Sequence, residues 1–279
     1  MTTNPVTAAV QRLDAEFPAL AAAVMPDFEV NARRAAATYG MKGLHEQRRL
    51  SLLTALDAAD WGDSSRSILT TLNAQALALA GVSNAPRVFR GLAECVQGKL
   101  LAVVSELAFA SYLRANGASI AFEVSYTLRS AGTVASRDVD VLATWDWGSV
   151  AFDVYSPVKE MHNTTTGFID PRPRGLARVV ADKVAHKFGS EGSACDGLPS
   201  GALKVIAVDL AYNHAGFFGL HSPLGQVKEE MAAAALAGAD AVLVFSHYQQ
   251  REGHPVVAHG ILYGSPRCAP LYRQFGLGG

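Results

Sequence analysis

The feature that most constrains the fold of this chain is a pair of short strand-like segments joined by a tight turn. The segments are residues 136–144 and 149–155, with Trp-Asp-Trp-Gly between them. If the turn is centred on the Asp-Trp pair, Asp140 lies directly opposite Asp153. Cross-strand partners have Cβ atoms about 5 Å apart, so two facing carboxylates need a cation or a shared proton. Because Mg²⁺ prefers oxygen ligands, we expect a divalent metal there.

Length and composition narrow the function classes. The chain has 279 residues, enough for one large domain or two modest ones, and its net charge is -1. The protein therefore has no overall positive charge that would attract nucleic acid, although this does not exclude a local basic groove. Three cysteines without zinc-site spacing indicate a reducing compartment, so we expect a cytoplasmic protein. We expect no signal peptide and no membrane partner, since the longest apolar run contains a glycine and an aspartate.

The pattern of apolar residues divides the chain in two. Residues 6–116 show helical spacing, and the last of these helices is expected over residues 86–116. We therefore expect an all-helical N-terminal region over residues 1–85 and an α/β core over residues 86–279.

The order of elements in the core predicts an α/β fold with a mixed central sheet. After the long helix we expect a strand over 120–128, the hairpin, a helix over 171–188, a buried strand over 203–210, a helix over 223–237, a buried strand over 241–245 and an edge strand over 255–263.

This order, together with its acidic residues, resembles the PD-(D/E)XK nuclease superfamily, whose restriction-endonuclease-like core runs αβββαβ. Glu106, in Val-Val-Ser-Glu-Leu-Ala-Phe, matches the helix acid of the family, and Asp140 matches its metal-binding aspartate. Asp153-Val-Tyr155 stands at the Asp/Glu-x-Lys position. The resemblance covers about residues 90–250. It implies hydrolysis of nucleic-acid phosphodiester bonds, DNA in preference to RNA, with Mg²⁺ or Mn²⁺ held by Asp140, Asp153 and Glu106.

The departure from the family motif is Tyr155, which stands where a lysine is expected. A tyrosine hydroxyl has a pKa near 10, so it donates a hydrogen bond but carries no positive charge. Lys183 and Lys187 share one face of the expected helix, and Lys159 follows the third strand. We favour Lys183 as the replacement, because it falls near the middle of the helix that should flank the third strand.

Two other hypotheses about the function remain open. The chain could be a catalytically inactive member of the fold that binds nucleic acid or protein, which Tyr155 and the near-neutral charge favour. It could instead be a small-molecule enzyme with its site at His214 and His221, which flank a glycine-containing loop after a buried strand. The sequence also allows a homodimer.

Overall fold

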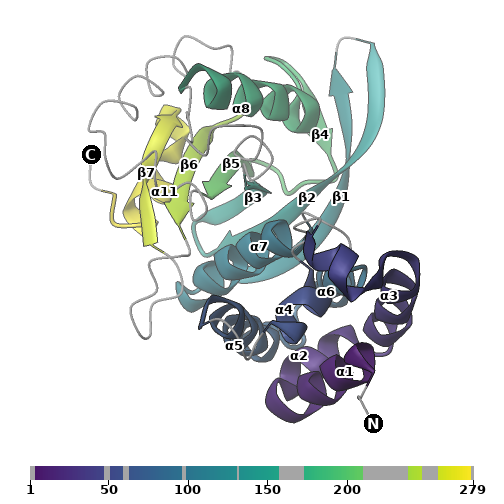
Figure 1. Ribbon diagram of the computed structural model, residues 1–279. Helices are drawn as coiled ribbons and strands as arrows, with labels where there is room; N and C mark the ends of the chain where they lie inside the picture. Colours follow the sequence, from purple (N-terminus) through teal and green to yellow (C-terminus); the bar gives the residue numbers. More distant parts are fainter. Residues whose placement is uncertain are drawn as a thin grey trace. The chain divides into compact units, whose positions relative to one another are not determined.

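A computed structural model of the chain describes residues 4–46, 51–58, 63–95, 99–130, 132–156, 173–209, 238–246 and 257–277. The chain divides into two compact units, Met1–Leu107 and Ala108–Gly279, which are described separately below (Figure 1). This division falls inside helix α7 (Lys99–Ala115). The domain boundary at residues 85–86 stays a prediction.

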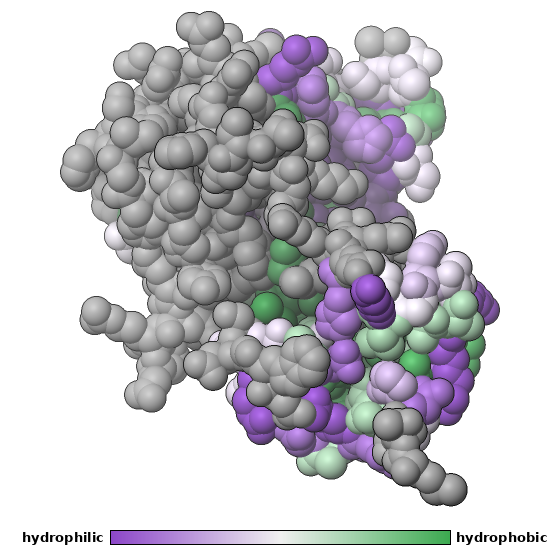
Figure 2. All heavy atoms as spheres, viewed as in Figure 1, coloured by the Kyte–Doolittle hydropathy of each residue, from purple (hydrophilic) through white to green (hydrophobic). Residues whose placement is uncertain are grey.

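The first unit is built from helices. Besides the first part of α7, its helices are α1 (Pro5–Glu16), α2 (Pro18–Val24), α3 (Asp27–Glu46), α4 (Leu52–Asp57), α5 (Asp63–Ala78) and α6 (Ala85–Ala93). Helix α2 packs against α5 and α6, and α1 packs against α4, with Leu13, Leu20, Leu53 and Leu72 fully buried. On the face seen in Figure 2, hydrophilic and hydrophobic residues are interspersed over this unit, as expected for amphipathic helices with one buried face.

The structure corrects one expected helix. Residues 86–116 do not form a single helix, because α6 ends at Ala93 and α7 begins at Lys99. Between them, Cys95 is buried and has a φ of 52°. A residue in the left-handed region cannot continue a right-handed helix, so the chain breaks at this point.

The second unit contains a mixed seven-stranded sheet in the order β4-β1-β2-β3-β5-β6-β7. Its strands are β1 (Ser119–Ser130), β2 (Thr133–Trp145), β3 (Gly148–Tyr155), β4 (Ala194–Asp196), β5 (Leu203–Asp209), β6 (Ala241–Ser246) and β7 (Val257–Gly264). β1, β2 and β3 form an antiparallel meander, β3, β5 and β6 are parallel, and β7 returns antiparallel to β6. The predicted α/β class and mixed sheet are confirmed. β4 was not predicted, because three residues are too few to show a periodic pattern.

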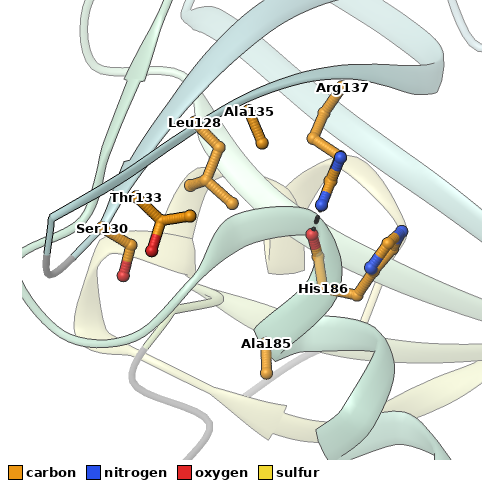
Figure 3. A pocket seen from close by; sticks show the side chains of 7 residues that line it. All are labelled: Leu128, Ser130, Thr133, Ala135, Arg137, Ala185 and His186. Atoms are coloured by element: carbon orange, nitrogen blue, oxygen red, sulfur yellow. Dashed lines mark hydrogen bonds between the residues drawn. The ribbon is translucent and has the colours of Figure 1, made fainter.

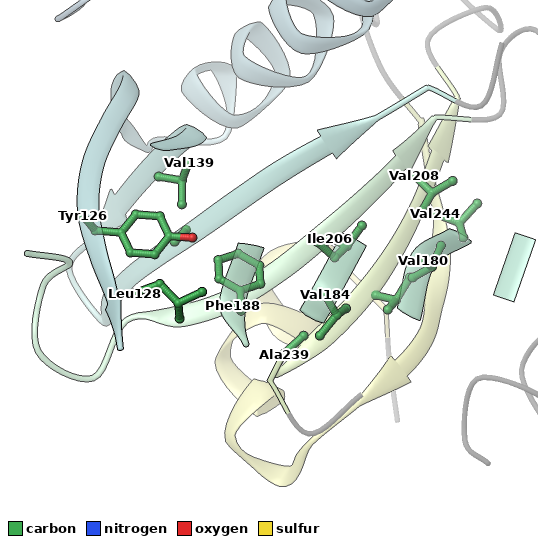
Figure 4. Close-up of a cluster of buried hydrophobic side chains, with 12 residues drawn as sticks. Tyr126, Leu128, Val139, Val180, Val184, Phe188, Ile206, Val208, Ala239 and Val244 are labelled. Carbon is green, nitrogen blue, oxygen red and sulfur yellow. The ribbon is translucent and has the colours of Figure 1, made fainter. Parts of the chain in front are cut away.

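Helix α8 (Pro173–Phe188) covers one face of this sheet. Val180, Val184 and Phe188 of α8 pack on strand residues that include Ile206 and Val208 (Figure 4). On β3, Phe152 lies next to Ala151 of this cluster and therefore points to the opposite face. There its ring contacts Phe109, from the part of α7 that belongs to this unit, with 5.0 Å between ring centroids.

The central strands are thus covered on both faces, and this explains their sequence. Six of the seven residues of β5 and all six of β6 are buried. A strand covered on both faces has a continuous apolar sequence rather than an alternating one. This continuous run is the signal that predicts both strands from the sequence. A 3₁₀ turn, η2 (Pro266–Cys268), and helix α11 (Ala269–Gln274) follow β7.

Gly238 provides a test of the packing between the end of α8 and the entry to β6. A Cβ added at Gly238 would overlap the carbonyl oxygen of Gly189 and lie 3.2 Å from Cγ1 of Val184. Because backbone cannot move aside as a flexible side chain does, we expect Gly238→Ala to lower the free energy of unfolding by about 3 kcal/mol. Urea denaturation would measure this change.

Gly43→Ala is the matched control. Its new Cβ would meet only Cβ of Tyr39, at 3.8 Å, inside helix α3. Alanine is about 1 kcal/mol better than glycine within a helix, so this variant should be as stable as the parent or more so. Equal stability of the two variants would contradict the packing described here.

Candidate functional site

The site begins at the hairpin between β2 and β3. Trp145 pairs with Gly148 across a two-residue turn, and the ladder continues to the pair Val141 and Phe152. This is the register predicted from the sequence. The ladder stops one pair short of the two aspartates, however, so Asp140 and Asp153 are not themselves a ladder pair.

Beyond the last pair, the two aspartates take different roles. Asp140 Oδ2 accepts a hydrogen bond of 2.7 Å from the backbone N–H of Val154, and so replaces a carbonyl of the ladder. Asp153 lies on the buried part of β3, where it is aligned with Ile206 of the parallel strand β5. The fork between β2 and β3 therefore places both carboxylates beside the same short stretch of chain.

Strand β2 is irregular at Asp140 on its other side as well. The pairing of β1 with β2 skips Glu123 and Asp140, and Glu123 has a φ of 44°. Val139 belongs to the cluster beneath α8, whereas Val141 pairs with Phe152, which faces away from α8. The strand thus changes face at Asp140. Left-handed backbone at a residue other than glycine is uncommon and tends to occur at functional sites.

Lys187, in the last turn of α8, lies between the two carboxylates. Its Nζ is 2.6 Å from Asp153 Oδ1 and 3.6 Å from Asp140 Oδ1, and it donates a hydrogen bond of 3.0 Å to the carbonyl of Asp138. The Asp153 side chain is 1% exposed and the Lys187 side chain 16%. An ammonium so placed compensates the buried charge of Asp153.

Lys183 lies one turn earlier on the same face of α8. Its Nζ is 3.6 Å from Asp153 Oδ2 and 5.0 Å from the ring centroid of Tyr155, and its side chain is 33% exposed. The positive charge that Tyr155 lacks is therefore supplied beside it from the helix, in the geometry of a cation–π contact. We call Asp140, Asp153, Lys183 and Lys187 the aspartate–lysine cluster.

The charges within this cluster shift one another's pKa values. Burial, and then the neighbouring Asp153, raise the pKa of Asp140 to about 7, although Lys187 opposes this shift. Burial lowers the pKa of Lys187, but the two aspartates raise it by more, so its pKa lies above the ordinary value and the side chain stays charged. With a pKa of about 7, Asp140 is partly protonated near neutral pH.

The cluster offers two carboxylates to a divalent ion. Among the described residues, no group of three or more His, Cys, Asp or Glu side chains could hold a metal. Mg²⁺, however, is commonly held by only one or two carboxylates together with waters and substrate phosphates. In the described structure, Asp153 Oδ1 lies 2.6 Å from the Lys187 ammonium and Oδ2 lies 3.6 Å from the Lys183 ammonium. A metal on Oδ1 would require the Lys187 ammonium to move aside.

The remaining predicted residues lie either in the first unit or outside the described residues. Glu106 lies on α7 within the first unit, with its Oε1 buried, so the site defined here rests on the second unit alone. Lys159, His214 and His221 lie outside the described residues.

Sequence reasoning missed the residues that position the end of α8. The Tyr126 hydroxyl donates to the carbonyl of Lys187, and Arg137 Nε donates to the carbonyl of His186 at 3.0 Å. Both donors come from β1 and β2. Contacts between residues some fifty to sixty positions apart leave no signal in a periodic pattern.

Comparisons of this chain with protein-family models, with curated proteins and with solved structures found no match. In the described parts of the chain, no helix has the length and the apolar character needed to cross a membrane.

The two lysines should differ in their effect on stability. Lys187→Met would leave the buried Asp153 without its closest cation, so we expect a loss of about 3 kcal/mol in the free energy of unfolding. Lys183→Met removes a longer and more exposed ion pair, and should cost less than about 1 kcal/mol. Urea denaturation of both variants measures the difference. Equal losses would show that Lys187 does not compensate the buried charge of Asp153.

Asp140 should make stability depend on pH in an unusual direction. Its folded-state pKa of about 7 lies above that of an unfolded aspartate, so between about pH 4 and 7 the folded state binds more protons. Stability from this group is therefore full at low pH and is lost as pH rises through 7. Without divalent ions, we expect Asp140→Asn to be more stable than the parent at pH 8.

The size of this gain is limited by solvent. About a quarter of the Asp140 side chain is exposed, so water screens part of the repulsion, and we expect about 1–2 kcal/mol at pH 8 and little difference at pH 4. Asp138→Asn is the control, because the Asp138 side chain is exposed and accepts a hydrogen bond from Ser125 instead. A pH-independent difference between Asp140→Asn and the parent would contradict the raised pKa.

Proposed function

We propose that this protein is a metal-dependent nuclease that hydrolyses nucleic-acid phosphodiester bonds at the aspartate–lysine cluster. The observation that carries the proposal is the pair of carboxylates at the β2–β3 fork, one of them buried, facing two lysines of α8. A buried carboxylate is costly to desolvate and is seldom kept without a partner or a function.

The topology of the second unit supports a restriction-endonuclease-like core. Its chain order is the end of α7, then β1, β2 and β3, then α8, then β5, with the short β4 inserted before β5. This is the order αβββαβ, with an antiparallel meander followed by a parallel strand. The aspartates fall on the second and third strands, as the resemblance to the PD-(D/E)XK superfamily implies.

Asp140, Asp153 and the backbone carbonyl of Val154 would hold Mg²⁺ or Mn²⁺. When bound, such an ion activates water and stabilises the charge that develops on a phosphoryl group. Asp140 is oriented for this by the N–H of Val154, which fixes one oxygen and leaves the other directed toward Lys187.

Lys187 and Lys183 would together replace the missing motif lysine, each with a different role. Lys187 is the more buried one and contacts both carboxylates, so it keeps the site neutral and folded. Lys183 is more exposed and adjoins both Asp153 and Tyr155, so its ammonium can approach a substrate phosphate and offset negative charge there. DNA is the preferred substrate in this proposal, ahead of RNA.

One alternative has an observation of its own. Lys187 already balances the carboxylates in the absence of metal, and Tyr155 carries no charge. A catalytically inactive protein that uses this fold to bind nucleic acid or protein would show the same two features. Calorimetric titration with Mn²⁺ separates the alternatives, because an inactive site closed by Lys187 should bind no metal.

Asp153→Asn is the decisive variant. It removes one metal-binding charge while keeping the shape of the side chain, so we expect Mn²⁺-dependent cleavage of DNA to fall at least about 100-fold. Gel analysis of labelled single-stranded and duplex DNA measures cleavage, and circular dichroism checks that the fold is retained.

Asp138→Asn is the matched control for cleavage. It changes an aspartate on β2, the strand that carries Asp140. In the described structure the Asp138 side chain accepts a hydrogen bond from Ser125 and not from either lysine, and the variant keeps the carbonyl that accepts from Lys187. We expect near-normal cleavage from this variant. Unchanged cleavage by Asp153→Asn would remove the assignment.

A further inference from the structure

A cavity of about 360 Å³ lies beside the aspartate–lysine cluster, between α8 and strands β1 and β2. It is lined by Leu128, Ser130, Thr133, Ala135, Arg137, Ala185 and His186. Figure 3 shows Arg137 and His186 at one end of the cavity and Ser130 and Thr133 at the other. The cavity thus has a cationic end, an apolar middle and a hydroxyl end, and its size falls within the range of small-molecule sites.

The cationic end is the one that adjoins the cluster. Arg137 precedes Asp140 by three residues on β2, about 10 Å of extended strand. His186 directly precedes Lys187, and Arg137 Nε donates to the carbonyl of His186. A strand that has one phosphate at Asp140 and Asp153 and runs along β2 toward Arg137 would place a neighbouring phosphate near Arg137.

The polar groups of this cavity are oriented by the fold. The Arg137 guanidinium is held through Nε by His186 and through Nη1 by the carbonyl of Ser136. Among the contacts within the described residues, these two bonds leave Nη2 for a ligand. At the other end, the hydroxyl of Ser193 donates to Ser130 Oγ at 2.8 Å, so the hydrogen of Ser130 is available to donate elsewhere.

The charges of neighbouring side chains act on His186. Burial, and then the charges of Arg137, Lys187 and Lys183, lower the pKa of His186. A phosphate group placed there would meet Nη2 of the Arg137 guanidinium, and its negative charge would reduce the repulsion between these cations.

We propose that Arg137 and His186 bind the phosphate that adjoins the scissile one in a nucleic-acid strand, while Ser130 and the apolar middle of the cavity contact the attached sugar. The proposal rests on the proposed function for the identity of its ligand. A phosphate group could also come from a free mononucleotide, and the experiment below distinguishes the two sources.

The test measures binding rather than cleavage. The full chain, in EDTA so that no divalent ion supports hydrolysis, is titrated into fluorescein-labelled single-stranded DNA and its duplex at several salt concentrations. We expect Arg137→Gln to raise the Kd about 5- to 10-fold at low salt and to reduce the salt slope by about one, because one phosphate contact is lost. Arg137→Lys keeps the charge and should retain the slope.

Arg129→Gln is the matched control. Arg129 lies on β1 next to Leu128 but on the opposite face, where it pairs with Asp196 at 2.5 Å. We expect its Kd to change less than about twofold. Thermal unfolding of all variants checks that loss of the Arg137–His186 bond has not unfolded α8.

Several outcomes would overturn the inference. The first two are an unchanged Kd and salt slope in Arg137→Gln, and a loss of affinity in Arg129→Gln as large as that in Arg137→Gln. The others are no binding of DNA by the parent chain, and binding of a mononucleotide that depends on Arg137 when binding of the DNA strand does not. Cleavage by the parent with Mn²⁺ is scored separately. If cleavage is absent while the Arg137 effect holds, the proposed function fails and the phosphate site stands. If cleavage is present while Arg137→Gln binds normally, only the phosphate site fails.

Discussion

The buried charge of Asp153 is the constraint on which the second unit depends. A carboxylate removed from water needs a compensating partner, and among the described residues the cations that pair with Asp153 are Lys183 and Lys187. The cation comes from α8, so the helix has to lie with its last turns over the β2–β3 fork. With α8 in this position, its apolar residues pack on β3, β5 and β6.

The irregular backbone around Asp140 belongs to the same arrangement. A regular ladder would direct every second residue of β2 to one face, and Val139, Val141 and Asp140 could not all occupy their present positions. The left-handed Glu123 and the early end of the β2–β3 ladder allow the strand to bury both valines on different faces and still present Asp140 to Lys187. The regular strand pairing is interrupted at the residue whose side chain points to Lys187.

Much of this could be predicted from the sequence, for identifiable reasons. The hairpin register followed from a turn of two residues, and the buried strands β5 and β6 followed from continuous apolar runs. The break after α6 could not be predicted, because nothing in the residue type of Cys95 indicates a left-handed φ. The preference for Lys183 over Lys187 rested on which residue lies nearer the middle of the helix. The observed closeness of Lys187 to both carboxylates depends on Tyr126 and Arg137, which lie far away in the sequence.

These two donors have a consequence for how the fold can vary. Tyr126 and Arg137 bind carbonyls in the last turn of α8, so the position of the lysines is set from the C-terminal end of the helix, by the sheet. The length of the chain between β3 and the start of α8 is then free to change without displacing either ammonium. Insertions before α8 would therefore leave the charges of the cluster in place.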